Sequence, residues 1–271
     1  MPKNPPPPRL YKYQPFTPHT LANLKSTQIW FNAPTRFNDP FDCALPLYDP
    51  SHLTDAGFLR VYEHEKQRHP MTPELEAALG PNGVPSPVFR DMILNAVQDT
   101  ITKLRKTLLE ERGVACFSEK PLDIMMWSHY ADGHRGFCLE FDTSYVPWVS
   151  KTFQVRYSDK FPYINPVDII VEPAGADPEN PLLVASVLTK ALCWQDEHEW
   201  RTMHQDPNKL FGYDWRALTG IYFGAAMPPA HKEILCLILH GSPTHLYNVE
   251  RDPKGFALNA TKVNYKPYDW T

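Results

Sequence analysis

The chain has 271 residues and carries 27 lysine and arginine residues against 31 aspartate and glutamate residues, which gives a formal net charge of −4. Because 42% of the residues are hydrophobic and 13% are aromatic, the composition predicts a globular protein with a full core and excludes a disordered chain. The sequence has no basic excess of the kind that indicates nucleic-acid binding by bulk charge. A local basic groove that binds RNA or DNA as a substrate is still an alternative.

The five cysteines are far apart and form no CxxC pair, a pattern typical of reduced thiols in a cytoplasmic protein. The first residues, MPKNPPPPRLYKY, lack the apolar segment of a signal peptide. No apolar run approaches the ~20 residues that a membrane helix needs. We therefore expect a cytoplasmic protein that has no membrane partner.

The first residues predict a short tail and then the beginning of a sheet. Proline, with 29 residues against 12 glycines, favours short elements joined by stiff loops. Residues 1–9 are predicted to form a proline-rich tail, followed by a single α+β domain over 10–271. The alternating residues 10–13 predict a first strand, and a short helix then precedes a second strand at 28–32.

A helical insertion is predicted at about residues 49–112. Its strongest helix covers 87–112, where apolar residues recur at helical spacing. Ser86 is a suitable N-cap, Pro87 fits the first turn, and Gly113 follows the end of the pattern.

Beyond the insertion, short strands and helices alternate irregularly and no repeat is visible. We predict helices over 122–132, 181–193 and 228–239. We predict strands over 114–118, 136–142, 153–159, 167–172, 197–204, 219–224, 245–250 and 257–265. The sequence has neither a GxGxxG nor a GxxxxGK[ST] phosphate loop. This pattern predicts an α+β fold with a mixed, mainly antiparallel β-sheet.

The stretch WQDEHEWR at 194–201 gathers the most unusual group of charges. In a strand, Glu197, Glu199 and Arg201 share one face, while His198 and Trp200 point to the other. Two carboxylates two residues apart repel each other unless a ligand or a cation lies between them. At least one is therefore predicted to have a raised pKa, as general acid–base catalysis requires. The alternative is a structural salt bridge in which Arg201 neutralises a glutamate.

The stretch WSHYADGHRG at 127–136 places His129 and Tyr130 near the end of a predicted helix. Both side chains can stack on a planar ligand or hydrogen-bond to it, and the alternative is that they pack the helix onto the sheet. His134 follows His129 by five residues, without an HExxH pattern or a cysteine pair. We therefore expect no metal site.

The loop RFNDPFD at 36–42 is fixed by a proline and places Asn38 and Asp39 between two aromatic residues, the second of which is Phe41. Its polar groups and rings can hold part of a ligand. The turn-forming chemistry of Asn and Asp explains the same residues without a ligand.

Six motifs in order along the chain resemble a known bacterial family. They are LYKY, WFNAPTRFNDPFD, VACFSE, MWSHYADGHRGFCLEFD, VRYSD and WQDEHEWR. The chain resembles domain-of-unknown-function family 2971 (DUF2971), which is related to the abortive-infection proteins called AbiGi. The family has been suggested to belong with the ADP-ribosyltransferases, which split a small mixed β-sheet around NAD.

This resemblance implies roles for particular residues. Lys12 would correspond to the basic residue of the first strand, Ser118 to the serine at the end of a central strand, and Glu197 and Glu199 to the late E-x-E motif. Glu199 would bind the ribose and stabilise the oxocarbenium ion, and Glu197 would orient or deprotonate the acceptor. Stacking on nicotinamide is expected from Phe41, Phe117 or Tyr130. Further contacts with NAD are expected from Tyr13, Asn38, Asp39, His129 and Arg201.

Three functions follow as hypotheses. The first is an NAD-dependent ADP-ribosyltransferase or NAD glycohydrolase, a toxin or phage-defence effector that uses NAD as substrate and needs no metal. Its acceptor is a protein, a nucleic acid or a small molecule, and Glu199→Gln is expected to abolish NAD cleavage with little loss of stability. The second is a catalytically inactive module that binds a nucleotide or a partner protein, as an antitoxin or a sensor. The third is a Mg²⁺-dependent nuclease in which Glu119 or Glu140 supplies a further carboxylate.

Overall fold

An eight-stranded β-sheet forms the centre of the computed structural model, which describes residues 5–43, 53–68, 70, 72–80, 83–147, 149–163, 165–171 and 185–266. Its strands are β1 (Arg9–Gln14), β3 (Gly113–Ser118), β4 (Phe137–Asp142), β5 (Thr152–Gln154), β8 (Glu199–His204), β10 (Leu218–Phe223), β11 (His245–Arg251) and β12 (Leu258–Val263). Their order across the sheet is β12-β11-β10-β4-β1-β3-β8-β5.

Neighbouring strands of this sheet run antiparallel, except that β10 and β11 are parallel. Two small sheets accompany it: β2 (Gln28–Phe31) pairs with β9 (Lys209–Gly212), and β6 (Arg156–Ser158) pairs in parallel with β7 (Thr189–Ala191). The predicted α+β fold with a mixed, mainly antiparallel sheet is confirmed.

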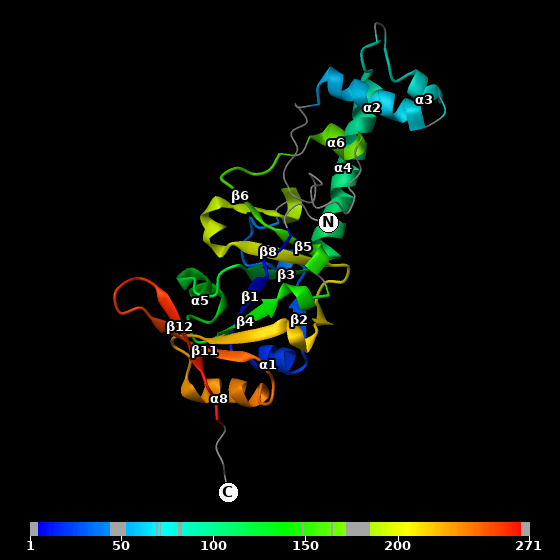
Figure 1. Cartoon of the computed structure of the whole chain (residues 1–271). Coiled ribbons are helices and arrows are strands. Elements are labelled where there is room, and N and C mark those ends of the chain that lie inside the picture. The colour runs from blue at the N-terminus through cyan, green and yellow to red at the C-terminus, as the bar shows by residue number, and fades with distance from the viewer. Residues whose placement is uncertain are drawn as a thin grey trace.

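Helices cover both faces of the sheet and extend beyond it (Figure 1). Their bounds are α1 (Pro18–Lys25), α2 (Asp55–Arg68), α3 (Pro73–Glu76), α4 (Pro87–Arg105), α5 (Ile124–Tyr130), α6 (Pro166–Val171) and α8 (Pro229–Ile238). Alternate residues of β1 and β4 enter two different cores. Leu10 and Phe141 belong to the larger core, to which α1 and α8 contribute. Tyr13 and Cys138 belong to a smaller core with Trp127 of α5.

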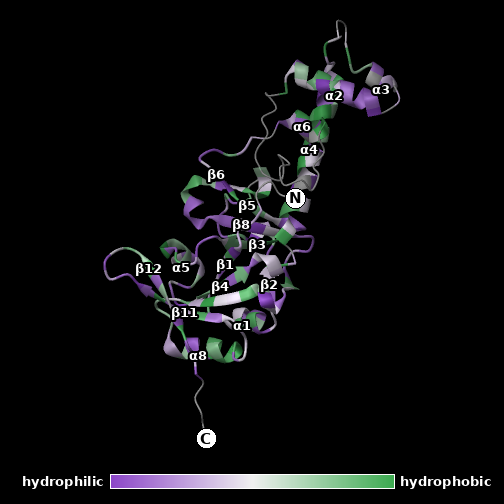
Figure 2. Ribbon diagram, viewed as in Figure 1, coloured by the Kyte–Doolittle hydropathy of each residue, from purple (hydrophilic) through white to green (hydrophobic). Residues whose placement is uncertain are grey.

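The helices α2, α3, α4 and α6 project away from the sheet (Figure 1). Hydrophobic residues are concentrated where these helices meet (Figure 2). They bury a core of their own, with Phe58, Val61 and Val97 at its centre. The first turn of α4 is capped as the sequence predicts, because the Ser86 hydroxyl accepts a hydrogen bond from the amide of Phe89 at 3.3 Å.

Three predicted elements differ from the structure. The strand expected over 153–159 is divided at Val155 into β5 and β6, which belong to different sheets. Residues 167–172 were expected to form a strand, but 166–171 form α6, because Val167 is buried in the core of the helical part and the Asn165 side chain caps the helix. The helix expected over 181–193 does not reach its predicted end, because Thr189–Ala191 forms β7 against β6. The first residues of that helix lie outside the described ranges.

Within the ranges that the structure describes, none of the helices is both long enough and apolar enough to span a bilayer. All five cysteines carry free thiols, and Cys193 is exposed.

The tight turn before β4 gives a test of the fold. A Cβ added at Gly136 would lie 2.1 Å from the Gln14 carbonyl oxygen, which is backbone and cannot move freely, whereas a Cβ at Gly255 would meet nothing within 4 Å. We expect Gly136→Ala to lower the free energy of unfolding by about 1–3 kcal/mol. Gly255→Ala should leave it unchanged or raise it by up to about 1 kcal/mol. Urea unfolding measures both, and equal effects would contradict this packing.

Candidate functional site

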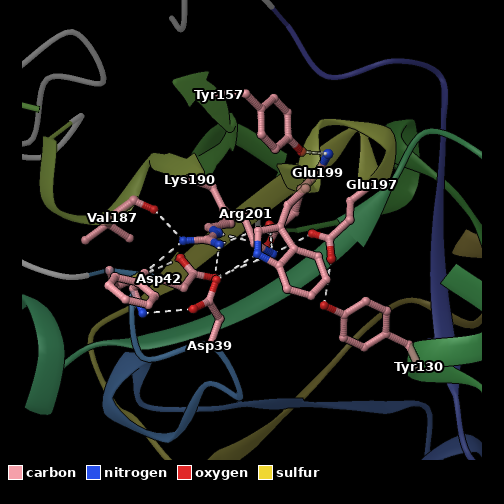
Figure 3. A network of polar contacts seen from close by, with 12 residues as sticks. Asp39, Asp42, Tyr130, Tyr157, Val187, Lys190, Glu197, Glu199 and Arg201 are labelled. Atoms are coloured by element: carbon pink, nitrogen blue, oxygen red, sulfur yellow. Dashed lines mark hydrogen bonds and ion pairs between the residues drawn. The ribbon is translucent and has the colours of Figure 1, made fainter. Parts of the chain in front are cut away.

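Five charged side chains form a buried cluster where β8 begins (Figure 3). They are Asp42, Lys190, Glu197, Glu199 and Arg201, and each side chain is at most 8% exposed. They come from the 36–42 loop, from β7, from a short 3-10 helix and from β8. Buried charges cost several kcal/mol each unless they are paired and hydrogen-bonded, so these contacts hold four segments of the chain together.

Arg201 is fully buried and all its donor groups are engaged. Its Nε donates to Oε1 of Glu199 at 2.8 Å, and one terminal nitrogen donates to Oε2 of the same carboxylate at 3.0 Å. That nitrogen also donates to Asp42 at 2.7 Å, while the other donates to the Val187 carbonyl at 2.7 Å. A two-point contact of this kind fixes the position of the Glu199 carboxylate.

Lys190 lies between the two glutamates. Its Nζ is 2.5 Å from Oε2 of Glu197, 3.2 Å from Oε2 of Glu199 and 3.6 Å from Asp42. The ammonium group also lies 5.0 Å from the ring centroid of Trp194. The cation expected between the two carboxylates is therefore a residue of the chain itself.

The backbone turns sharply between Glu197 and Glu199. Glu197 ends the 3-10 helix Leu192–Glu197, and His198 adopts a left-handed conformation with φ of 44°. The strand expected over 197–204 therefore begins only at Glu199, because the turn interrupts the extended backbone. Glu199 and Arg201 share one face of β8, as predicted. Trp200 points to the opposite face, enters the larger core and donates to Glu119 at 2.6 Å.

Hydroxyl groups hold both glutamates from neighbouring elements. The Tyr130 hydroxyl of α5 donates to Oε1 of Glu197 at 2.7 Å, and the Ser118 hydroxyl at the end of β3 donates to the Glu197 carbonyl at 2.7 Å. The Tyr157 hydroxyl accepts a hydrogen bond from the amide of Glu199 at 2.8 Å. The two glutamates are thus held in fixed positions.

The environment pushes the pKa values of the two carboxyl groups apart. Burial raises the pKa of Glu197, and the nearby Glu199 acts in the same direction against the opposing effect of Lys190. Burial also opposes ionisation of Glu199, but the Arg201 guanidinium and the Lys190 ammonium outweigh it and lower the pKa of Glu199 to about 2. Glu199 therefore stays ionised to a lower pH than Glu197 does.

A pocket of about 140 Å³ opens beside the two glutamates. β1 and β3 pair only at Tyr11 and Ser118, whereas six residue pairs join β1 to β4. Side chains from both β1 and β3 line the pocket. The lining residues are Tyr11, Lys12, Tyr13, Phe37, Asn38, Asp42, Cys116, Phe117, Met126, Tyr130, Lys190, Glu197 and Glu199.

Lys12 is the lysine that β1 contributes to this pocket. Its Nζ donates to the Cys116 carbonyl at 3.0 Å and lies 5.2 Å from the ring centroid of Phe117. Within the described ranges no carboxylate approaches Lys12 within 4.0 Å, and burial lowers its pKa. Burial disfavours the charged form of Lys12, and an anionic group of a ligand placed beside it would favour that form.

The predicted site residues fall into three groups. Those that line the pocket are Lys12, Tyr13, Asn38, Phe117, Tyr130, Glu197 and Glu199. Ser118 and Arg201 do not line the pocket. Ser118 donates a hydrogen bond to the Glu197 carbonyl, and Arg201 donates to the Glu199 carboxylate. Asp39 accepts a hydrogen bond from the Trp194 indole at 2.7 Å, His129 packs edge-on against the same ring at 5.7 Å, and Phe41 lines a separate pocket.

The carboxylates considered for a metal site lie elsewhere. Glu119 accepts from Trp200, and Glu140 accepts from Thr219 at 2.7 Å and Tyr222 at 2.8 Å. Neither lines the pocket beside Glu197 and Glu199. In the part of the chain that the structure describes, no group of three or more His, Cys, Asp or Glu side chains is arranged to hold a metal ion.

The sequence interpretation missed Lys190, Tyr157 and Cys116, and it placed Asp42 in the 36–42 loop without predicting its contact with Arg201. Lys190 was assigned to a helix, and no local motif distinguishes it from a surface lysine. Its role depends on the pairing of β7 with β6, which joins segments more than thirty residues apart. Cys116 lies in an apolar strand pattern that predicts only burial, and Tyr157 lies in a short polar strand where nothing in the local sequence indicates its contact with Glu199.

Residues 126–202 match the family described as "Protein of unknown function (DUF2971)". This confirms the family resemblance over a segment that contains most of α5, all of β4, Lys190 and both glutamates. Three of the six motifs fall inside it, namely MWSHYADGHRGFCLEFD, VRYSD and WQDEHEWR. No curated protein matches the chain significantly. No solved structure does so either.

The burial of Glu199 changes what a substitution there should do. The expectation that Glu199→Gln costs little stability does not fit the structure, because Arg201 would lose the charge of its two-point partner. Removing one member of a buried ion pair typically costs about 3–5 kcal/mol. We expect a loss of that order at neutral pH, measured by urea unfolding.

The same carboxylate gives a test in acid. The folded pKa of about 2 lies below the ordinary value of 4.5, so the stability that Glu199 contributes is present above pH 4.5 and is lost as the pH falls towards 2. This contribution is on the order of 3 kcal/mol. Urea unfolding between pH 5.5 and pH 3 should show a smaller loss in Glu199→Gln than in the wild type. Ile93→Ala, in the core of the helical part, should keep the wild-type dependence; identical curves for all three proteins would rule out this role of Glu199.

Proposed function

We propose that the protein cleaves NAD at its nicotinamide–ribose bond, as an ADP-ribosyltransferase or an NAD glycohydrolase. The observation that carries this proposal is a pocket with a permanent anion, Glu199, beside a second carboxyl group of raised pKa, Glu197. A pair of carboxyl groups with separated pKa values is suited to stabilising a cation and moving a proton.

The size and walls of the pocket suit the nicotinamide ring. An apolar cavity of about 150 Å³ is known to hold benzene, so the volume here fits one six-membered ring and not a whole dinucleotide. Tyr130 provides an aromatic wall and Asn38 lines the same space. The Phe117 ring is 2% exposed and packs with its strand partner Trp200 in the larger core, so it is not available for the stacking expected of it. An amide of this kind can hydrogen-bond the carboxamide of nicotinamide.

The charges suit the chemistry of bond cleavage. When the bond between the ribose carbon and the ring nitrogen breaks, nicotinamide leaves as a neutral molecule and positive charge develops on the ribose. The Glu199 carboxylate is held in place to stabilise that charge. Water or an acceptor group then adds to the ribose carbon, and its proton passes to the ionised Glu197.

The placement of the motifs agrees with the resemblance to ADP-ribosyltransferases. Lys12, Ser118 and Glu199 lie on β1, β3 and β8, which are neighbours in the sheet. Ser118 differs from that expectation because it holds the backbone of Glu197 and does not line the pocket. On this proposal the chain is a cytoplasmic bacterial effector, with a toxin or phage-defence role and a protein, nucleic acid or small molecule as acceptor.

A second candidate function is a nucleotide-binding module without turnover, which serves as an antitoxin, a sensor or the partner of another protein. One observation favours it: both oxygens of Glu197 and both oxygens of Glu199 already accept hydrogen bonds from within the chain. A catalytic role requires that a substrate compete with Lys190 or Tyr130 for these oxygens. The assay below separates the two functions.

The first test is nicotinamide release from NAD by the purified wild type, Glu199→Gln, Glu197→Gln and Ile93→Ala, with and without cell lysate. We expect Glu199→Gln to reduce release by about 10²–10³-fold, the effect typical of losing one preorganised stabilising group. Glu197→Gln should also reduce it. Ile93→Ala, measured below its unfolding midpoint, controls for lost stability and should stay near wild type.

Stimulation of release by lysate would indicate transfer to an acceptor. A folded wild type that releases no nicotinamide under either condition would contradict the enzyme proposal and favour the binding module.

A further inference from the structure

A second pocket, of about 110 Å³, lies next to the first. Lys190 lines both pockets. The second pocket is also lined by Phe41, Ser158, Lys160 and Phe161. The glutamates contribute nothing to it, so its chemistry differs from that of the first pocket.

Two large aromatic side chains face solvent at this pocket. Phe41 is 62% exposed and Phe161 is 60% exposed. Their ring centroids are 6.1 Å apart with an angle of 48° between the rings, although the residues lie 120 positions apart in the sequence. Neither ring belongs to a buried core of the described residues. Exposed aromatic pairs that contribute nothing to a core mark binding surfaces.

The size of the first pocket leaves part of the proposed substrate without a site. If its 140 Å³ are filled by a nicotinamide ring, the adenylate half of the dinucleotide must contact the surface beside it. The second pocket adjoins the first across Lys190 and offers aromatic faces for a planar base. Lys160 is exposed at the same pocket, next to the exposed carboxylate of Asp159, and its ammonium group can pair with a phosphate group.

We propose that the pocket formed by Phe41 and Phe161 binds the adenine ring of an adenine nucleotide. The identification of that nucleotide as NAD depends on the proposed function. Phe41 was expected to stack on nicotinamide, and its position assigns it to the base at the other end of the same substrate.

The test compares Phe41→Ala and Phe161→Ala with Phe256→Ala, a control at a fully exposed aromatic outside both pockets. Nicotinamide release is measured with NAD and with nicotinamide mononucleotide, which lacks the adenylate. We expect KM for NAD to rise about tenfold in either pocket variant, the effect typical of losing one stacked ring. Release from the mononucleotide should be unchanged in all three variants.

Binding of AMP, measured by calorimetry, separates this inference from the proposed function. If the wild type releases no nicotinamide but binds AMP, and the two pocket variants weaken that binding, the enzyme proposal fails and the adenine site stands. If NAD is cleaved with the same KM in wild type and pocket variants, the adenine site is overturned. A fall confined to lysate-stimulated transfer also overturns it, because the pocket would then bind the acceptor. Absence of both cleavage and AMP binding overturns both proposals.

Discussion

The two-point contact between Arg201 and Glu199 is the interaction on which the rest of the site depends. A guanidinium with no exposed surface is tolerated only because Glu199, Asp42 and the Val187 carbonyl accept its hydrogen bonds. Lys190 extends the cluster from Glu199 to Glu197. The same contacts that connect the 36–42 loop, β7 and β8 thereby set which carboxyl group stays ionised. The residues that stabilise this part of the fold are also those proposed to act in catalysis. Removing the charge of one of them should therefore lower both the free energy of unfolding and the proposed activity.

The pocket follows from an irregularity of the sheet. β1 and β3 share a single residue pair, so neighbouring residues of the two strands are left to line a hollow in the sheet. Lys12 and Phe117 border it from the strands, and Tyr130 borders it from α5 while holding Glu197. A ligand in this space would touch a lysine, an aromatic wall and two carboxyl groups at once. The helical part, with its separate core, lies apart from this chemistry (Figure 1).

Much of the sheet was predictable because its strands are short alternating or continuous apolar runs bounded by turn residues. Leu10 and Tyr13 of β1 enter different cores, as a period of two requires. The strand predicted over 167–172 was wrong because a short apolar run is compatible with a helix packed on a core as well as with a strand. At the site, local sequence placed Glu199 and Arg201 on one face, since that depends only on neighbours in a strand. It did not reveal Lys190, whose position depends on pairing between distant segments, or the left-handed turn at His198 that redirects Glu197.

The most direct test of the central claim is a crystal structure of the protein soaked with NAD or its cleavage product nicotinamide. This account predicts a nicotinamide ring against Tyr130, and in the NAD complex a ribose beside the Glu199 carboxylate. The Arg201 contact with Glu199 should remain intact. A ligand bound outside this pocket, with the Lys190 and Arg201 contacts unchanged, would show that the buried charges are structural and would contradict the account.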